Sequence, residues 1–383
     1  MSARRLSLLV MLVGACVWLP SLHLLFSPKG DEGAALLERQ RARIEDRGAE
    51  TATHDRLRRT NPEWDLMRRT FLTLALLNEA LAEPTRRDAN LRLVDGILDE
   101  LLADDRAGGP YTFLLPYAHA RRFVFEDRSL FVDGEIALLL AARQLVAPRP
   151  DLDAELASRV TTIERLMTAS PSVSGESYPD EAWTFCNTTA LAALRLSDAH
   201  SGTHHDALAA TWLAYAKGHL VDPANGLLVS SYTYDGRVLD GPEGSSIFMV
   251  AHNLLLWDED FAKDQFVRAK RELAFDVLGF ALAHEWPRAS SARADVDSGP
   301  IVPFLEASAG ASGMAVLGAA AFHDDALQEG LWRSLYFAGF PERKDGALRF
   351  RASNELGDAV LTYARSFGPL WELGKGRGRE ARR

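Results

Sequence analysis

Signatures of metal and nucleotide binding are missing from this chain of 383 residues. It contains two cysteines and therefore no set of cysteine pairs at zinc-site spacing, and it has neither an HExxH motif nor a glycine-rich loop that would hold phosphates. We therefore expect no metal and no cofactor. A net charge of −10 at pH 7 argues against binding to nucleic acid through a basic surface.

Domain linkers and long β-strands are also missing. No segment has the proline, serine and glycine composition of a linker, and no repeat of fixed period indicates a regular solenoid. Alternating valine and isoleucine runs are absent apart from residues 227–234, which have the composition of a short hairpin strand. The hydrophobic content of 47% with 25% charged residues is that of a folded protein.

One long apolar run is present, at the N-terminus. Arg4 and Arg5 precede residues 6–26, a stretch long enough to span a bilayer and longer than the usual core of a secretory signal. The basic residues before the run favour a cytoplasmic N-terminus. We interpret residues 1–28 as a signal-anchor or signal peptide in the cytoplasmic membrane, with the body in the periplasm or outside the cell. Cys16 follows a sequence that resembles a lipoprotein cleavage site, but the apolar run continues past it.

Amphipathic helices account for most of the remaining chain. Residues 29–60 are polar and favour a spacer or a short helix, whereas from residue 61 apolar residues recur at helical spacing. The predicted helices span 63–82, 87–104, 128–147, 151–169, 181–199, 204–220, 245–257, 259–283, 301–322, 324–337 and 355–367. The spacer would supply a twelfth helix.

The lengths of the connections favour one closed architecture. Long connections at 105–127, 170–180, 221–244 and 284–300 alternate with short ones, and the long ones carry most of the acids and aromatics. In a double ring of helices such loops gather at one end and form a pocket. We therefore predict an all-α protein with an (α/α)6 toroid over residues 61–370, followed by a basic flexible tail at 371–383.

The stretch 176–187 is the densest group of reactive side chains. It contains Ser177, Tyr178, Trp183 and Cys186, and we expect Asp180 to cap the helix that follows through its side-chain oxygen. A helix N-terminus lined by acids, a thiol and aromatic side chains is typical of a small-molecule site. The alternative is an ordinary capped helix with a buried cysteine.

A second acid lies near the start of the predicted helix 128–147. Glu135 is followed by a nearly unbroken apolar run, so burial would raise the pKa of its carboxyl group as a general acid requires. The alternative is an acid placed near a helix start by the helix dipole.

Further candidates lie in two later loops and one helix. A glycine-rich loop before the helix 245–257 carries tyrosines and acids, and a lone histidine on that helix is more often a core residue than a ligand. An Asp-x-Asp-Ser-Gly segment follows later, and a calcium site there lacks the loop length that it needs. The candidates are Tyr234, Asp235, Glu243, His252, Asp295 and Asp297, the last in a catalytic role.

These motifs resemble the linalool dehydratase-isomerase family of bacterial terpene-alcohol enzymes. The resemblance covers roughly residues 60–370 and includes the Asp-x-Asp-x-Gly segment. It implies an (α/α)6 toroid that needs no cofactor and works outside the cytoplasm. The matching positions, in order, are Pro179, Asp180, Cys186, Asn187, Asp222, Pro223, Gly226, Ser231 and Tyr232.

Two positions depart from the pattern of that family. Its first cysteine falls on Ser177 and its catalytic histidine on Glu135, so that hydroxyl and carboxyl groups replace a thiol and an imidazole. The proton chemistry of the site must therefore differ, whereas the fold is expected to be the same.

Three functions follow. In a cofactor-independent lyase or isomerase acting on an allylic or terpene alcohol, Glu135 would be the acid and Cys186 or Asp180 the base, with Tyr178, Trp183 and Phe185 as an apolar wall. In a glycoside hydrolase, paired carboxylates would act in the same toroid. A membrane-tethered scaffold would not bring the acids together. The two enzymes predict a small-molecule substrate, and a homo-oligomer remains open.

Overall fold

A computed structural model of the chain describes residues 3–288 and 298–376. Asp295, Asp297 and most of the tail at 371–383 lie outside the described residues, so the roles predicted for the two aspartates stay predictions. The division of the chain into anchor, spacer, toroid and tail also stays a prediction.

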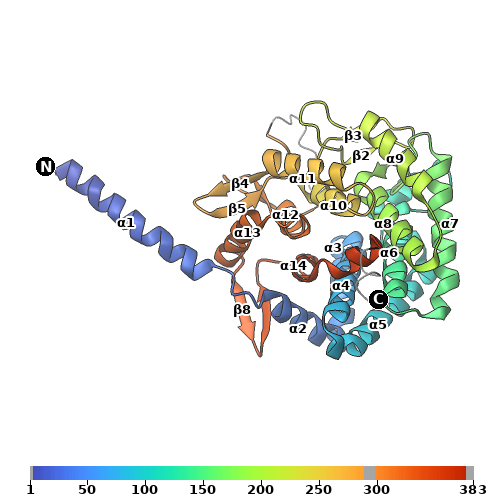
Figure 1. The fold of residues 1–383 in the computed structure, drawn as a ribbon, viewed down its shortest axis with the longest axis horizontal. Helices are drawn as coiled ribbons and strands as arrows, with labels where there is room; N and C mark the ends of the chain where they lie inside the picture. The colour runs from blue at the N-terminus through green and yellow to red at the C-terminus, as the bar shows by residue number, and fades with distance from the viewer. Residues whose placement is uncertain (1–2, 289–297, 377–383) are drawn as a thin grey trace.

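The described part of the chain forms two concentric layers of helices, as the sequence predicts (Figure 1). The inner helices are α4 (Pro62–Ala82), α6 (Leu130–Val146), α8 (Thr184–Ser201), α10 (Gly244–Leu254), α12 (Ala309–Ala321) and α14 (Glu355–Ser366). The outer helices are α2 (Glu32–Glu45) with α3 (Arg47–Thr60), α5 (Arg87–Gly108), α7 (Asp153–Ala169), α9 (Asp206–His219), α11 (Glu259–Leu273) and α13 (Asp325–Ala338). Inner and outer helices alternate along the chain.

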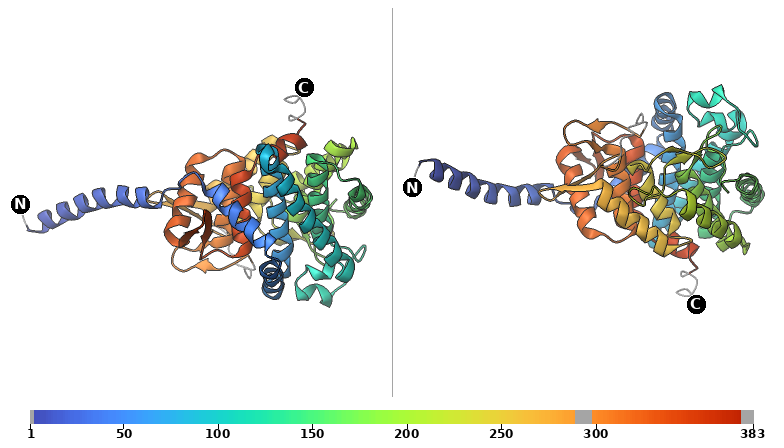
Figure 2. Two further views of the ribbon diagram at one scale, coloured as in Figure 1. Left: turned by 90° about the horizontal axis from the view of Figure 1, so that it is seen from below. Right: turned by 90° about the horizontal axis from the view of Figure 1, so that it is seen from above.

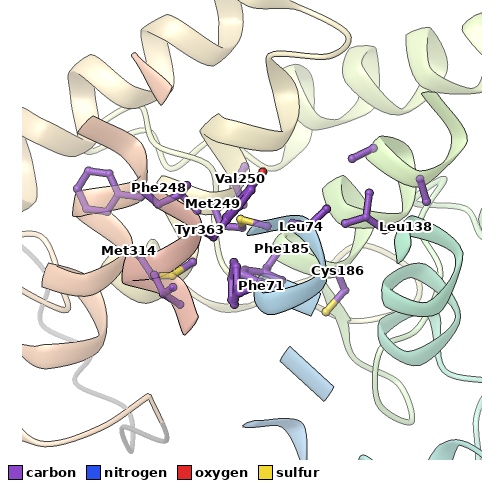
Figure 3. Close-up of a cluster of buried hydrophobic side chains, with 14 of the residues drawn as sticks. Phe71, Leu74, Leu138, Phe185, Cys186, Phe248, Met249, Val250, Met314 and Tyr363 are labelled. Atoms are coloured by element: carbon purple, nitrogen blue, oxygen red, sulfur yellow. The ribbon is translucent and has the colours of Figure 1, made fainter. Parts of the chain in front are cut away.

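The inner helices close into a ring. Each contacts the next in the order α4, α6, α8, α10, α12 and α14, and α14 contacts α4 again. All six contribute side chains to one buried apolar cluster (Figure 3). Its labelled members are Phe71 and Leu74 from α4, Leu138 from α6, Phe185 and Cys186 from α8, Phe248, Met249 and Val250 from α10, Met314 from α12 and Tyr363 from α14. This closure establishes the (α/α)6 toroid.

The connections differ in length at the two ends of the ring. Short connections, at 83–86, 147–152, 202–205, 255–258 and 322–324, follow the C-termini of inner helices. Long connections, at 109–129, 170–183, 220–243, 274–308 and 339–354, precede their N-termini. Because the inner helices therefore start at the same end, the long connections gather there, as the sequence predicts.

Short strands and 3-10 turns are built from these connections. β1 (Ala182–Trp183), β2 (Ser231–Tyr232) and β3 (Val238–Asp240) form an antiparallel sheet, with Ala182 opposite Tyr232. The antiparallel pairs are β4 (Ala274–Val277) with β5 (Phe280–Ala283), β6 (Ile301–Val302) with β7 (Ala307–Ser308), and β8 (Pro341–Lys344) with β9 (Ala347–Phe350). The 3-10 turns are η1 (Pro84–Arg86), η2 (Pro110–Thr112), η3 (Pro116–Ala120) and η4 (Pro150–Leu152).

The predicted helix boundaries were wrong by three or more residues in five places, two of which are the end of α5 at Gly108 rather than 104 and the end of α10 at Leu254 rather than 257. The helix predicted at 259–283 ends at Leu273, because Leu278 and Gly279 adopt positive φ and turn the chain into the β4–β5 hairpin. The helix predicted at 301–322 starts at Ala309, where Ser308 caps it by accepting from the Ala311 amide. The helix predicted at 181–199 starts at Thr184 because the preceding residues pair as β1.

The segment at 29–60 forms α2 and α3, which pack on α14 and α4. Leu36 is fully buried there. Both terminal nitrogens of Arg68 on α4 donate to the carboxylate of Glu50 on α3, at 2.7 and 2.8 Å. Asp65, also fully buried, contacts His54 and accepts from Arg58 at 2.7 Å. These buried ion pairs hold the outer helix α3 against the inner helix α4.

The N-terminal helix α1 (Ala3–Phe26) projects away from this body (Figures 1 and 2). It has no buried residue and is long and apolar enough to cross a membrane. Its last turns contact the β4–β5 turn and α13, where the His23 ring lies 2.6 Å from the Leu278 carbonyl oxygen. A signal sequence near the N-terminus can pass the same test of length and hydropathy.

Candidate active site

The candidate site lies where the N-terminal halves of α4, α6 and α8 meet. α6 and α8 pack closely because Gly134 has no side chain: a Cβ atom there would lie 3.2 Å from the Cβ of Ala190. Glu135 follows Gly134, and Cys186 precedes Ala190 by about one helical turn. The close approach of the two helices therefore brings the carboxyl group and the thiol together.

Glu135 is a buried acid that lacks a full set of partners. Its side chain is 1% exposed, and its Oε2 atom has no hydrogen-bond partner among the described residues. Burial raises the pKa of this carboxyl group to about 7, although the nearby Thr70 hydroxyl acts in the opposite direction. Glu135 therefore holds a proton over much of the range below neutral pH, as a general acid requires.

Cys186 is a thiol rather than a thiolate at neutral pH. Burial raises its pKa well above the usual value, and the charges of Glu63 and Glu135 act in the same direction, while the Ser177 hydroxyl lowers it. Cys186 thus lies close to all three groups. A raised thiol pKa does not favour the base role that the sequence suggested for Cys186, and that role stays a prediction.

Ser177 and Asn187 fix the loop that leads into α8. The Ser177 hydroxyl accepts from the Trp183 amide at 3.3 Å, and the Ser177 carbonyl accepts from the Ser129 hydroxyl at 2.7 Å. The Asn187 side chain accepts from the Gly175 amide at 3.0 Å and donates to the Gly175 carbonyl at 3.2 Å. These bonds hold Ser177 against the start of α8.

Tyr178 connects this loop to α4. Its hydroxyl donates to Glu63 in the first turn of α4 and accepts from the Leu115 amide at 2.9 Å. Burial, and then the Glu63 charge, raise the pKa of this phenol far above its usual value. The Tyr178 ring stacks on Tyr117 at a centroid distance of 4.7 Å, and the Tyr117 hydroxyl donates to Glu181 at 3.0 Å. Tyrosine–carboxylate pairs therefore line this side of the site.

The expectation that Asp180 caps α8 was wrong. Trp183 occupies the cap position without a side-chain cap bond, since β1 lies between Asp180 and the helix. Asp180 has a φ of 61° in a turn, its amide donates to Glu176 at 2.7 Å, and its carboxylate accepts from the Tyr234 amide at 3.2 Å. Asp180 therefore joins two loops.

Three other candidates lie in the loop between α9 and α10. Tyr234 donates its hydroxyl to the Ala169 carbonyl at 2.9 Å, and Asp235 is exposed and accepts from Thr233. Glu243 occupies the cap position of α10. The contacts of Tyr234 and Asp235 are thus with residues other than Glu135 and Cys186. Trp183 is half-buried and follows the loop of Ser177.

His252 lies in the last turn of α10, at the opposite end of the ring. It is fully buried, its Nε2 atom lies 3.0 Å from the Tyr363 hydroxyl, and its ring lies 4.5 Å from that of Trp371 in α15 (Pro369–Gly374). Burial lowers its pKa to about 3, so it stays neutral. The structure gives His252 the core role that we considered more frequent for such a residue.

Glu63, Thr70 and Tyr117 lie at the candidate site but were not among the residues predicted for it. Glu63 follows Pro62 at a helix start, where an acid is ordinary, and Tyr117 lies in a loop without a motif. Their approach to Tyr178 and Glu135 depends on ring closure. Among the described residues, no group of three histidine, cysteine, aspartate or glutamate side chains is placed to hold a metal.

Comparison with known proteins identifies a family, and one solved structure supports this fold. The family model described as linalool dehydratase/isomerase matches residues 155–356. No curated protein matches the chain. The solved unsaturated glucuronyl hydrolase of Bacillus sp. GL1 has a TM-score of 0.51 at 14% identity, over 83% of this chain and 88% of that one. A GH76 alpha-mannanase of Bacteroides thetaiotaomicron has a TM-score of 0.49 at 9% identity, over 83% of this chain and 86% of its own.

Proposed function

We propose that this chain, which belongs to the linalool dehydratase/isomerase family, eliminates water from an allylic or terpene alcohol or isomerises it by acid–base catalysis. The observation that carries the proposal is the buried Glu135 carboxyl group beside the Cys186 thiol, with a pKa of about 7. A proton held in an apolar environment at neutral pH suits protonation of an alcohol, whose hydroxyl is a poor leaving group until it becomes water.

In this proposal Glu135 transfers its proton to the substrate hydroxyl. The carbon–oxygen bond breaks and water departs, and the allylic cation that remains is shielded by the rings of Phe71 and Phe185 in the apolar cluster (Figure 3). A base then removes a proton from the neighbouring carbon, and the electrons of that carbon–hydrogen bond form the new double bond. Isomerisation is the return of water to a different carbon of the same cation.

Glu63 is the base in this proposal. It accepts a hydrogen bond from Tyr178, and its charge acts on both Tyr178 and Cys186, so it lies on the same side of the site as the thiol. Cys186 and Ser177 orient the substrate between the two carboxyl groups, since a neutral thiol and a hydroxyl can each donate a hydrogen bond. The proton passes from Glu63 to solvent, and Glu135 is reprotonated to complete the cycle.

The two departures from the family pattern are compatible with this reaction. The family's histidine and first cysteine fall on Glu135 and Ser177 by the resemblance given above, and both residues lie beside Cys186. The replacements thus occur together in one site. A carboxyl group whose pKa burial raises to about 7 titrates close to an ordinary imidazole, so it can take over the acid role.

A glycoside hydrolase is the second candidate. The observation in its favour is the stack of Tyr117 on Tyr178 next to Glu181 and Glu63, since aromatic faces and paired carboxylates are what sugar hydrolysis needs. Offering the full chain a terpene alcohol and an oligosaccharide panel separates the two. Alkene formation that Glu135→Gln abolishes supports the lyase, and sugar release with the alcohol untouched supports the hydrolase.

We further propose that α1 anchors the body to a membrane, with the body on its outer side. Large apolar side chains are exposed around the base of α1: Leu278 is 64%, Phe337 56% and Phe340 66% exposed. Phe26 packs edge-on against Phe337 at 5.2 Å, so the apolar surface of α1 continues onto the body. Mass spectrometry of the protein from washed membranes tests this, because a cleaved signal would leave a mature chain without α1.

A further inference from the structure

A basic hollow lies on the outer side of α14, between that helix, α2 and β9. Its volume is about 320 Å³, and none of the residues in its wall belongs to the candidate active site. The charged residues of the wall are Arg39, Arg43, Arg349, Arg351, Glu355 and Asp358. Guanidinium groups at the start of a helix form a surface that attracts anions.

Arg39 and Arg351 retain unused hydrogen-bond donors, whereas Arg43 pairs with Glu355 and Arg349 pairs with Glu342. Arg39 approaches Asp358 only to 3.7 Å, and the pKa of its guanidinium is lowered by burial and, to a smaller extent, by the neighbouring Arg43 and Arg349. No hydrogen bond or ion pair of the Arg351 side chain is found in the described part of the chain. Glu355 offers little opposing charge, because Arg43 at 2.9 Å and Arg56 both bind its Oε1 atom.

Asp358 supplies an independent indication of a ligand. It is 4% exposed, and its Oδ1 atom has no hydrogen-bond partner among the described residues. Burial raises the pKa of this carboxyl group to about 6, although the nearby Ser353 hydroxyl and the charge of Arg39 lower it. A buried carboxylate oxygen without a partner is unfavourable, so a donor entering the hollow would stabilise it.

We propose that this hollow binds a phosphate that carries one P–OH group, as inorganic hydrogen phosphate and the monoanion of a phosphate monoester do. The guanidinium groups of Arg39 and Arg351, with Arg43 and Arg349, donate to the phosphate oxygens, and the P–OH donates to Asp358 Oδ1. Sulfate has no O–H at neutral pH and would leave Asp358 unpaired next to an anion. The hollow therefore selects phosphate over sulfate. This inference does not depend on the proposed function.

Two sources would present this group. One is a soluble phosphate, and the other is a lipid headgroup with a terminal phosphate. Arg351 also lines a second hollow of about 710 Å³, whose wall includes Leu25 and Phe26 at the end of α1. If α1 spans a membrane, a lipid headgroup would reach the site from there.

Calorimetric titration of the full chain in detergent with sodium phosphate and with sodium sulfate, at matched ionic strength, tests the site. We expect phosphate to bind at least tenfold more tightly than sulfate. Arg351→Gln should weaken phosphate binding by tenfold or more, whereas Arg92→Gln, which removes an exposed arginine on α5, should not. Equal binding of the two anions, no binding of phosphate, or an unaffected Arg351→Gln would overturn the proposal.

The Asp358→Asn variant tests the preference for phosphate over sulfate separately from the affinity for phosphate. Because an amide can donate to sulfate, the preference for phosphate should fall to near unity in this variant; an unchanged preference contradicts the role of Asp358. If Asp358→Asn does not fold, the affinities of the parent for phosphate and sulfate and the affinity of Arg351→Gln for phosphate still test the site.

Competition with nanodiscs separates the two sources of the phosphate group. One set of discs contains phosphatidate, and the other contains phosphatidylcholine alone. Displacement of phosphate by the phosphatidate discs alone identifies the headgroup, and no displacement identifies soluble phosphate.

Discussion

Tyr178, in the loop before α8, donates its hydroxyl hydrogen to Glu63 in the first turn of α4, 115 residues earlier in the chain. Ring closure brings these residues together, and the contact joins the thiol side of the site to a carboxylate on another inner helix. We propose that Tyr178 positions Glu63 as the base, and that Glu135 is the acid.

Tyr178→Phe removes the donor to Glu63 and keeps the ring. Since the carboxylate loses a partner that stabilises its charged form, its pKa should rise and the acid limb of the rate–pH profile should move to higher pH. We expect kcat to fall about 10- to 100-fold, within the range typical of acid–base groups. Rate measurements from pH 4 to 9 check this. Tyr215→Phe, on the outer helix α9, is the matched control, and an unshifted acid limb in Tyr178→Phe would count against the pair.

The Glu135 pKa of about 7 predicts a fall in activity as the pH rises. The active form of a general acid is the protonated one, so kcat/KM should decrease as the pH rises through about 7. Glu135→Gln cannot donate a proton and should lose this limb together with the activity. A profile that is flat between pH 6 and 8 would show that another group supplies the proton.

The raised pKa of Glu135 also makes the folded protein less stable as the pH rises. The folded state holds the Glu135 proton up to about pH 7, whereas a glutamate in the unfolded chain releases its proton near its usual pKa of 4.5. The protein is therefore destabilised relative to Glu135→Gln as the pH rises from about 4.5 to 7, by an amount on the order of 3 kcal/mol, and the difference is constant above that. Denaturant unfolding of both proteins at pH 5 and pH 8 measures it. A difference that shrinks with rising pH contradicts the assigned shift.

Cys186 should react slowly with alkylating agents in the folded protein. Its thiol is buried and burial raises its pKa, so little thiolate is present at pH 7.5. In a Cys16→Ala background we expect iodoacetamide to label Cys186 at least 100-fold more slowly than in denaturant. Mass spectrometry follows the reaction, and rapid labelling of the native protein would mean that the thiolate is present.

The Asp65 network holds α3 on α4. Asp65→Asn removes the fully buried one of the two carboxylates that Arg58 and Arg69 share, while Asp104 remains, and this should cost about 3 kcal/mol. Asp55→Asn changes an exposed residue of α3 and should cost less than about 0.5 kcal/mol. Denaturant unfolding compares the two. Equal stabilities of the two variants would show that the network contributes nothing to the packing of α3.

The arrangement of helices was accessible from the sequence because helical periodicity and connection length are local properties. The burial of Glu135 was predicted for the same reason, since an apolar run surrounds it in the sequence. The hairpin β4–β5 was missed because its residues continue the hydrophobic pattern of α11, and only the positive φ at Leu278 and Gly279 ends the helix.

The pairing of side chains across the ring was not accessible from the sequence. Asp180 has the composition of a helix cap, yet the pairing of β1 with β2 moves the helix start to Thr184. Glu63 resembles an ordinary acid at a helix start until α4 and α8 meet. Each of these outcomes depends on contacts between segments that are 48 or more residues apart in the chain.

Product formation from linalool by the full chain tests the central claim most directly. The experiment compares the parent, Glu135→Gln and the control Glu83→Gln, which changes an exposed residue at the far end of α4. We expect the parent and the control to form alkene and water, and Glu135→Gln to form them at least 100-fold more slowly with its fold intact. Equal rates for all three proteins would contradict the assignment of Glu135 as the acid.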